Sequence, residues 1–240
     1  MIFDIHCHIL PNVDDGAKDG KTTKRMLQRA VEEGIDAIVA TPHYSCEMED
    51  EEIEQIRQKF LMIQKWWKEK EPDKELYLGS ELYYSEGLIA ALERGAALTM
   101  NGTRYILVEF PIYLNFQNIK KAVQKLLYAG YIPIIAHVER YERMKKLEMV
   151  SELVDMGALI QVNVSSVIGR NGFKDRFYVM KLIKKHVVHF VGTDAHDTEV
   201  RMIRMRACSQ YLEKKLGKEK AAQILEENPR RMLEGEELNG

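Results

Sequence analysis

Short apolar segments alternate with longer amphipathic segments along most of the chain. The apolar segments are rich in Ile, Val and Leu, which is typical of strands buried on both faces of a sheet. Strands that are separated by helices pair in parallel, so the pattern predicts a parallel sheet. The predicted strands are Ile2–Ile5, Ala37–Ala40, Leu76–Gly79, Ile106–Glu109, Ile132–Ala136, Leu159–Asn163 and His189–Gly192.

The amphipathic segments have the spacing of surface helices, and Gly34, Gly130 and Gly157 stand where three of them should end. The predicted helices are Lys21–Glu33, Asp50–Lys70, Glu86–Glu93, Gln117–Ala129, Glu142–Met156, Lys174–Lys185, Glu199–Leu216 and Lys218–Glu226. Seven strands in regular alternation with helices favour a closed or nearly closed barrel. An open doubly wound sheet is the alternative, but no glycine-rich phosphate-binding motif follows any predicted strand.

Composition narrows the class of protein. A length of 240 residues with 45% hydrophobic content fits one α/β barrel, so we expect a single domain over residues 1–240. The formal net charge of −2 gives no reason to expect a nucleic-acid partner. Cys7, Cys46 and Cys208 have no paired spacing, which favours a reducing compartment. No membrane span or signal peptide is recognised, so we expect a cytoplasmic protein.

Metal-competent side chains stand at the ends of nearly all the predicted strands. The carboxyl ends of barrel strands meet at one mouth, which is where barrel active sites lie. Several carboxylates gathered there would repel one another unless cations neutralised them. The candidate metal ligands are His6, His8, Asp15, His43, Glu81, Glu109, His137, Asp194 and His196.

The His-x-His pair has a geometric reason. Along an extended chain alternate residues share a face, so His6 and His8 can hold one ion while Cys7 points away. We expect Asp4 to orient this pair as an outer carboxylate. All the candidate ligands offer nitrogen or carboxylate oxygen, which suits manganese, iron, zinc or cobalt. The set is too large for one ion and predicts two or three.

Four motifs resemble those of a known family. They are Asp-Ile-His-Cys-His-Ile-Leu-Pro-Asn-Val-Asp-Asp-Gly-Ala, Ala-Thr-Pro-His, His-Val-Glu-Arg-Tyr and Gly-Thr-Asp-Ala-His. Together they resemble the PHP (polymerase and histidinol phosphatase) superfamily, in particular its bacterial manganese-dependent protein-tyrosine-phosphatase branch of capsule and exopolysaccharide synthesis. The resemblance covers almost the whole chain and implies a distorted seven-stranded β/α barrel of TIM-like shape.

The resemblance also implies how the site is used. One metal would take His6, His8, Glu81 and Asp194, a second would take Glu81, Glu109 and His137, and a third would take Asp15, His43 and His196. Manganese is the metal that the resemblance favours. Arg140 and Arg201 match arginines that hold the substrate phosphate, and Arg204 is an alternative to Arg201.

The implied activity is that of a phosphomonoesterase, which hydrolyses phosphotyrosine by a metal-activated hydroxide. Its implied substrate is a bacterial tyrosine kinase of capsular or exopolysaccharide synthesis. Two alternatives stay open, namely another PHP phosphoesterase, such as a histidinol-phosphate phosphatase, and a non-catalytic metal-binding partner. A cysteine-based phosphatase is excluded, because it needs a thiolate and an arginine in one short loop. The arginine's place is taken by Val13 after Cys7, Glu52 after Cys46 and Lys214 after Cys208.

Overall fold

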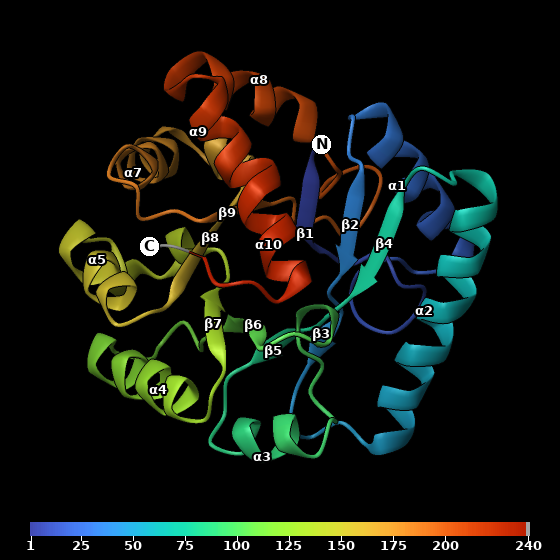
Figure 1. The fold of residues 1–240 in the computed structure, drawn as a ribbon, viewed down its shortest axis with the longest axis horizontal. Helices are drawn as coiled ribbons and strands as arrows, with labels where there is room; N and C mark the ends of the chain where they lie inside the picture. Colours follow the sequence, from blue (N-terminus) through green and yellow to red (C-terminus); the bar gives the residue numbers. More distant parts are fainter. Residues whose placement is uncertain (239–240) are drawn as a thin grey trace.

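In a computed structural model, which describes residues 1–238, parallel strands form the centre and helices surround them (Figure 1). The strands are β1 (Phe3–Cys7), β2 (Ala37–Ala40), β3 (His43–Tyr44), β4 (Glu75–Leu78), β5 (Glu81–Tyr83), β6 (Tyr105–Glu109), β7 (Ile132–Ile135), β8 (Leu159–Asn163) and β9 (Phe190–Gly192). The helices are α1 (Gly20–Glu32), α2 (Asp50–Lys70), α3 (Leu88–Glu93), α4 (Phe116–Tyr128), α5 (Leu147–Asp155), α6 (Val164–Val167), α7 (Phe173–Lys184), α8 (Met205–Leu216), α9 (Lys218–Ala222) and α10 (Asn228–Glu234). Short helical turns are η1 (Met100–Gly102), η2 (Val138–Arg140), η3 (Glu142–Met144) and η4 (Gln223–Glu227).

The strands lie in two parallel sheets that follow one another round a curve. One sheet has the order β1-β2-β4, and the other has the order β3-β5-β6-β7-β8-β9. The chain passes from the first sheet to the second twice, between β2 and β3 and between β4 and β5. At the other edge the segment after β9 returns to β1, where the His8 amide donates to the Ala195 carbonyl at 2.9 Å. The result is an α/β fold with a curled parallel sheet.

The predicted count of seven strands is not confirmed, because the described part of the chain has nine. Each of the seven predicted segments overlaps a strand, and β3 and β5 are additional. The strand that begins as β2 is interrupted at Pro42, whose nitrogen has no hydrogen to donate. The strand that begins as β4 is interrupted at Gly79, where a Cβ would lie 2.8 Å from the Met100 sulfur. Neither break was visible in the apolar pattern.

The end of the sheet at which the strands begin is closed by apolar packing. Phe3 and Ile5 of β1 and Tyr105 of β6 share a buried cluster with Met232 and Leu233 of α10. Helix α10 crosses the strands near the centre of the view in Figure 1, while α1 and α2 cover one side and α4, α5 and α7 the other. The polar side chains predicted to form the site therefore gather at the opposite end, where the strands finish.

Two predicted helices were wrong over part of their length. The segment predicted as Glu142–Met156 begins with the turn η3 and becomes an α-helix only at Leu147, where α5 begins. The segment predicted as Glu199–Leu216 becomes helical only at Met205, where α8 begins. The Asp197 carboxylate holds the amides of Glu199 and Val200 in a turn, both at 2.6 Å, and the Arg201 carbonyl accepts from the His196 amide at 2.9 Å, which closes the segment into a loop. The resulting loop carries Arg201 to the site.

No helix within residues 1–238 combines the length and the apolar character needed to cross a bilayer.

Candidate metal centre

An irregularity in β1 aims its two histidines at the mouth of the curled sheet. The pairing of β1 with β2 changes register between Asp4 and Cys7, a local feature that re-aims side chains. Cys7 packs into the core on the helix side, whereas the Nε2 atoms of His6 and His8 face each other at 3.2 Å. The prediction that the two histidines share a face and Cys7 points away is confirmed.

Asp4 has a different role from the one predicted. Its carboxylate accepts hydrogen bonds from the Thr193 amide at 2.9 Å and from the Thr193 hydroxyl, and it touches neither imidazole ring. Among the described residues, its only hydrogen bond with the His pair is the one that it accepts from the His6 backbone amide at 3.3 Å. Burial raises the pKa of Asp4 to about 6, although these hydrogen bonds lower it. Asp4 therefore fastens β1 to the segment after β9, which keeps His6 close to Asp194.

The first group of converging side chains is fully buried. An oxygen of Glu81, the first residue of β5, lies 3.1 Å from His6 Nε2 and 3.2 Å from His8 Nε2. Asp194 follows β9, and its Oδ1 lies 3.7 Å from His6 Nε2 and 3.6 Å from His8 Nε2. These atoms are close enough together to hold one ion.

The outer nitrogens of the two rings reveal how the inner ones are protonated. His8 Nδ1 lies 2.8 Å from the carboxylate of Asp14, which accepts, so this nitrogen carries the hydrogen. The Gln161 Oε1 atom accepts from the His137 amide at 2.7 Å and lies 3.3 Å from His6 Nδ1, which must therefore donate to it. In the neutral rings both Nε2 atoms are then left with lone pairs that point at each other and at Glu81.

Lone pairs and a carboxylate at these separations repel one another unless a cation lies between them. Burial lowers the pKa of His8, but hydrogen bonds to Asp14 and Glu81 outweigh it and raise that pKa to about 10. The pKa of Asp194 is held low by His6 and Arg140 in spite of its burial. The group therefore demands positive charge, and its nitrogen and oxygen atoms fit a divalent metal ion.

A second group surrounds the other face of Glu81. His137 Nε2 lies 2.7 Å from Glu81 Oε1 and 3.6 Å from Glu109 Oε1 at the end of β6. His43 of β3 lies beside this group, because it can share an ion with Glu81 and Glu109, although its Nδ1 lies 3.2 Å from Glu81 Oε2, the oxygen that also faces His6 and His8. Burial and the charge of Glu81 raise the pKa of Glu109. Glu81 thus lies between two groups, as expected from its assignment to two metals in the predicted ligand set.

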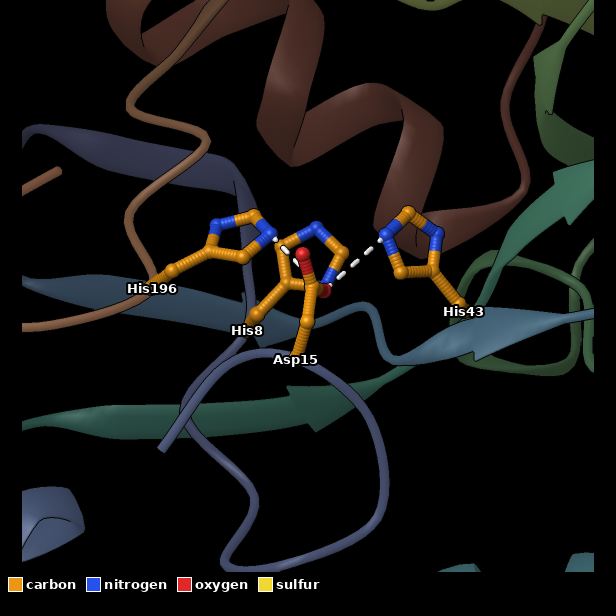
Figure 2. Close-up of side chains that lie close together, drawn as sticks. All are labelled: His8, Asp15, His43 and His196. Atoms are coloured by element: carbon orange, nitrogen blue, oxygen red, sulfur yellow. Dashed lines mark ion pairs between the residues drawn. The ribbon is translucent and has the colours of Figure 1, made fainter. Parts of the chain in front are cut away.

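The third group lies nearest to solvent. Asp15 Oδ1 lies 3.3 Å from His43 Nε2 and 3.2 Å from His196 Nε2, and Figure 2 shows its carboxylate between these two rings. His8 lies in the same group, with its ring centre 3.9 Å from that of His196. The structure therefore brings all the candidate ligands to one mouth, and it places His8 and His43 between neighbouring groups.

Both candidate phosphate-holding arginines lie at the edge of this centre. The guanidinium of Arg140 donates to Asp194 Oδ2 at 2.5 Å, and that of Arg201 donates to Asp194 Oδ1 at 2.7 Å. They line a cavity of about 370 Å³ that opens beside Asp194. Arg204 lines the same cavity but makes no ion pair with Asp194. The geometry favours Arg201 over Arg204 as the partner of Arg140.

Three polar residues of the site were not predicted. Asp14 also accepts from the His43 amide at 3.0 Å, and it therefore positions two candidate ligands. Gln161 and Asn163 alternate along β8, and Asn163 donates to Asp194 Oδ2 at 2.8 Å. The signal was present in the sequence, because two amide side chains on one face of an otherwise apolar strand need a polar surrounding.

Replacement of Asp14 by Ala should weaken metal binding without removing a ligand. Loss of a carboxylate that orients a metal-binding histidine lowers metal affinity by roughly 10- to 100-fold. We expect a higher Mn²⁺ concentration for half-maximal occupancy, measured by equilibrium dialysis. The exposed Asp73→Ala variant is the matched control. Unchanged Mn²⁺ affinity in folded Asp14→Ala protein would contradict this role.

Close backbone packing also holds the centre together. A Cβ added at Gly192 would lie 2.6 Å from the His6 Cβ and 3.0 Å from Gln161 Nε2. Gly192→Ala should therefore displace the His6 ring and reduce bound metal, which elemental analysis of the folded variant measures. Gly20→Ala, where nothing lies within 4 Å of the added atom, is the control. Equal metal content in both variants would show that this contact is unimportant.

Comparison with known proteins identifies the family. The model of the family described as "Capsular polysaccharide synthesis, CpsB/CapC" matches residues 2–234. This chain belongs to the CpsB/CapC family. It is 32% identical over 238 residues to the tyrosine-protein phosphatase CpsB of Streptococcus pneumoniae, covering 97% of this chain and 98% of that protein. It is 31% identical to the tyrosine-protein phosphatase YwqE of Bacillus subtilis, covering 99% and 93%.

Solved structures agree with this membership. A crystal structure from work on YwqE and CpsB, described as metal-dependent tyrosine phosphatases, superposes with a TM-score of 0.89 at 30% identity, covering 99% of this chain and 96% of that one. A phosphotriesterase from Mycobacterium tuberculosis shares the fold, with a TM-score of 0.57 at 12% identity and coverage of 97% and 94%. The resemblance to the metal-dependent tyrosine-phosphatase branch is confirmed.

Proposed function

We propose that this CpsB/CapC protein is a metal-dependent tyrosine phosphatase whose substrate is a phosphorylated tyrosine kinase of capsular or exopolysaccharide synthesis. One observation carries the proposal. Three groups of imidazole and carboxylate side chains converge at one mouth, and two arginines border them beside a cavity. The arrangement offers sites for cations and donors for a phosphate in one place, which is what hydrolysis of a phosphate ester requires.

We infer that the centre holds two or three divalent ions, with manganese as the first candidate and iron, zinc or cobalt as alternatives. His6, His8, Glu81 and Asp194 would hold one ion, and Glu81, Glu109 and His137 a second, with His43 beside them. Asp15, His43 and His196 would hold a third, which His8 also approaches. Such ions lower the pKa of water and neutralise the charge of a phosphate.

The two arginines would supply hydrogen-bond donors for the phosphate, which the candidate metal ligands do not offer. A guanidinium presents a planar fork that matches two phosphate oxygens, so Arg140 and Arg201 would each exchange a hydrogen bond to Asp194 for bonds to the substrate. They stand on one side of the centre, because both donate to the same carboxylate. Together they would hold the phosphoryl group at that side of the centre. A phenolate, with a pKa of about 10, leaves readily without a strong general acid.

The cysteines take no part in this chemistry. Cys7 and Cys208 are buried, and burial raises the pKa of both thiols, so neither presents a thiolate. Cys46 lies near Ser85, whose hydroxyl is 3.1 Å from its sulfur, and it is absent from all three groups. We expect the folded variant with Cys7, Cys46 and Cys208 all replaced by Ala to keep kcat on a phosphotyrosine peptide within about threefold, since only modest repacking is required.

A fall of kcat to background in that folded triple variant would instead indicate a nucleophilic cysteine. Circular dichroism and metal content establish that the variant is intact before its kcat is compared with that of the unaltered protein.

Comparison of three substrates tests the proposed function. The manganese-loaded protein should hydrolyse p-nitrophenyl phosphate and a phosphotyrosine peptide, with a higher kcat/KM for the peptide, and should act poorly on histidinol phosphate. Preference for histidinol phosphate would assign the protein to another activity on the same fold. No hydrolysis of any of the three by metal-loaded protein would support a metal-binding partner without catalysis.

We propose further that residues 1–240 work as one domain in the cytoplasm. The family model spans nearly the whole chain, and all three cysteines are free. The barrel is proposed as seven distorted strand regions, with β2 and β3 counted as one region and β4 and β5 as another.

A further inference from the structure

Two further arginines line the cavity that contains Arg140 and Arg201. They are Arg170, which follows α6, and Arg204, which precedes α8. In the part of the chain that the structure describes, Asp194 is the only acidic residue that lines this cavity, and it already accepts from Arg140 and Arg201. Within residues 1–238, neither Arg170 nor Arg204 has a carboxylate within 4.0 Å. The cavity lining therefore includes two arginines that pair with no carboxylate of the described residues.

Arg170 and Arg204 lie between two neighbouring hollows, because both residues line each of them. The second hollow, of about 470 Å³, is not lined by Asp194, and Glu33 stands in it with Arg29 and Arg206. A peptide that extended from the first cavity into the second would meet both arginines, which line both hollows. Arg170 is exposed and Arg204 is half-buried, so both can be reached by a ligand from solvent.

The loop that carries Arg170 is held in place locally. The Arg170 amide donates to the Ser165 carbonyl at 2.8 Å. The Asn171 side chain donates to the hydroxyls of Ser165 and Ser166, both at 3.0 Å. These bonds fix the backbone, while the guanidinium of Arg170 is left without a protein partner of opposite charge. The arrangement resembles a prepared anion site more than a salt-bridged surface, in which each arginine would have a carboxylate neighbour.

We propose that Arg170 and Arg204 form a second anion subsite, which binds a negatively charged group beside the phosphotyrosine that is being hydrolysed. The proposal rests on the proposed function and names its substrate class, a peptide with an anionic residue next to the phosphotyrosine. Two sources supply the same chemistry, the carboxylate of Asp or Glu and a second phosphorylated tyrosine. The phosphoryl group has the higher charge and accepts a bidentate guanidinium, so it should bind more tightly.

The test compares peptides that differ only beside the phosphotyrosine. One peptide has neutral neighbours, a second has Glu on either side in turn, and a third has a second phosphotyrosine. The unaltered protein should prefer the third peptide to the first by about tenfold in kcat/KM, with the glutamate peptides between them, as expected for partly exposed charge-assisted bonds. The difference should lie mainly in KM and should shrink as salt is added.

The Arg170→Ala, Arg204→Ala double variant should remove this preference. Its kcat/KM for p-nitrophenyl phosphate and the neutral peptide should fall by much less than its kcat/KM for the peptide with two phosphotyrosines, because charges away from the reacting group contribute little. The double Lys variant should recover part of the preference, since it keeps the charge without the fork. Arg230→Ala on α10, whose arginine pairs with Glu234 on a different face, is the matched control.

The outcomes separate this inference from the proposed function. Equal kcat/KM for all the peptides with active, unaltered protein would overturn the second subsite and leave the phosphatase activity standing. A preference that survives in the folded double variant would place the subsite on other residues and overturn the assignment. Failure of the unaltered protein to hydrolyse even the neutral phosphotyrosine peptide would overturn the proposed function and this inference with it.

Discussion

Replacement of Arg140 by Ala is expected to lower kcat/KM for a phosphotyrosine peptide by about 100-fold or more, the usual cost of removing one preorganised electrostatic donor. Arg140 stands at the edge of the centre and donates to Asp194, and its side chain is 41% exposed. The phosphate would take over these hydrogen bonds. Arg140→Lys should recover only part of the loss, since it supplies charge without the planar fork.

Metal content separates this effect from damage to the centre. Arg140→Ala keeps every candidate ligand, so elemental analysis should find the same metal content as in the unaltered protein. Arg143→Ala, which removes a nearby arginine that donates to the Tyr113 carbonyl, is the control. Near-normal kcat/KM in Arg140→Ala, or a defect explained by lost metal, would refute the substrate-holding role.

Replacement of Glu81 by Gln should have a still larger effect. The Glu81 carboxylate is buried and contacts His6, His8, His43 and His137, so it belongs to two of the three groups. An amide keeps the shape but removes the charge that holds cations there. We expect loss of at least one ion and a fall in kcat on the order of 1000-fold, which corresponds to several kcal/mol of transition-state stabilisation.

Glu86→Gln tests whether any loss of charge near the mouth has this effect. Glu86 is exposed and lies 3.9 Å from Lys125, away from the imidazoles. Its replacement should leave metal content and kcat unchanged. A folded Glu81→Gln variant with full metal content and normal kcat would show that Glu81 is not a bridging ligand.

The parts of the fold with the clearest pattern could be predicted from the sequence. The apolar runs at Ala37–Ala40 and Leu159–Asn163 coincide with β2 and β8, and the long amphipathic run Asp50–Lys70 coincides with α2. The very short strands β3 and β5 could not be predicted in this way, because they are too short to show a period. Each nevertheless carries a candidate ligand. The sequence therefore indicated the ligands His43 and Glu81 more clearly than the strands that hold them.

Local hydrogen bonds explain why the helix predicted to begin at Glu199 starts later. The run after Asp197 has helical spacing, yet the Asp197 side chain holds the next amides in a turn and the Arg201 carbonyl accepts from the His196 amide, which closes a loop. The same effect delivers Arg201 to Asp194, which a helix beginning at Glu199 would not have allowed. Sequence pattern gives no weight to such local hydrogen bonds, and the start of α8 was therefore misplaced.

The candidate site was more predictable as a set than residue by residue. A single histidine at a strand end carries little information, but parallel strands bring all their ends to one mouth, so repeated His, Asp and Glu there imply a shared site. Asp14, Gln161 and Asn163 were missed because they support ligands instead of joining them. Their partners depend on contacts between β8, β1 and the loop after β1, which no local pattern encodes.

Metal removal followed by manganese titration tests the central claim most directly. The protein is chelated until elemental analysis finds no bound metal, and hydrolysis of a phosphotyrosine peptide is measured as Mn²⁺ is returned. We predict activity below about 1% without metal and recovery that follows occupancy at more than one ion per chain, as expected when ions supply the main charge stabilisation. Full activity in protein shown to be free of metal would contradict the account.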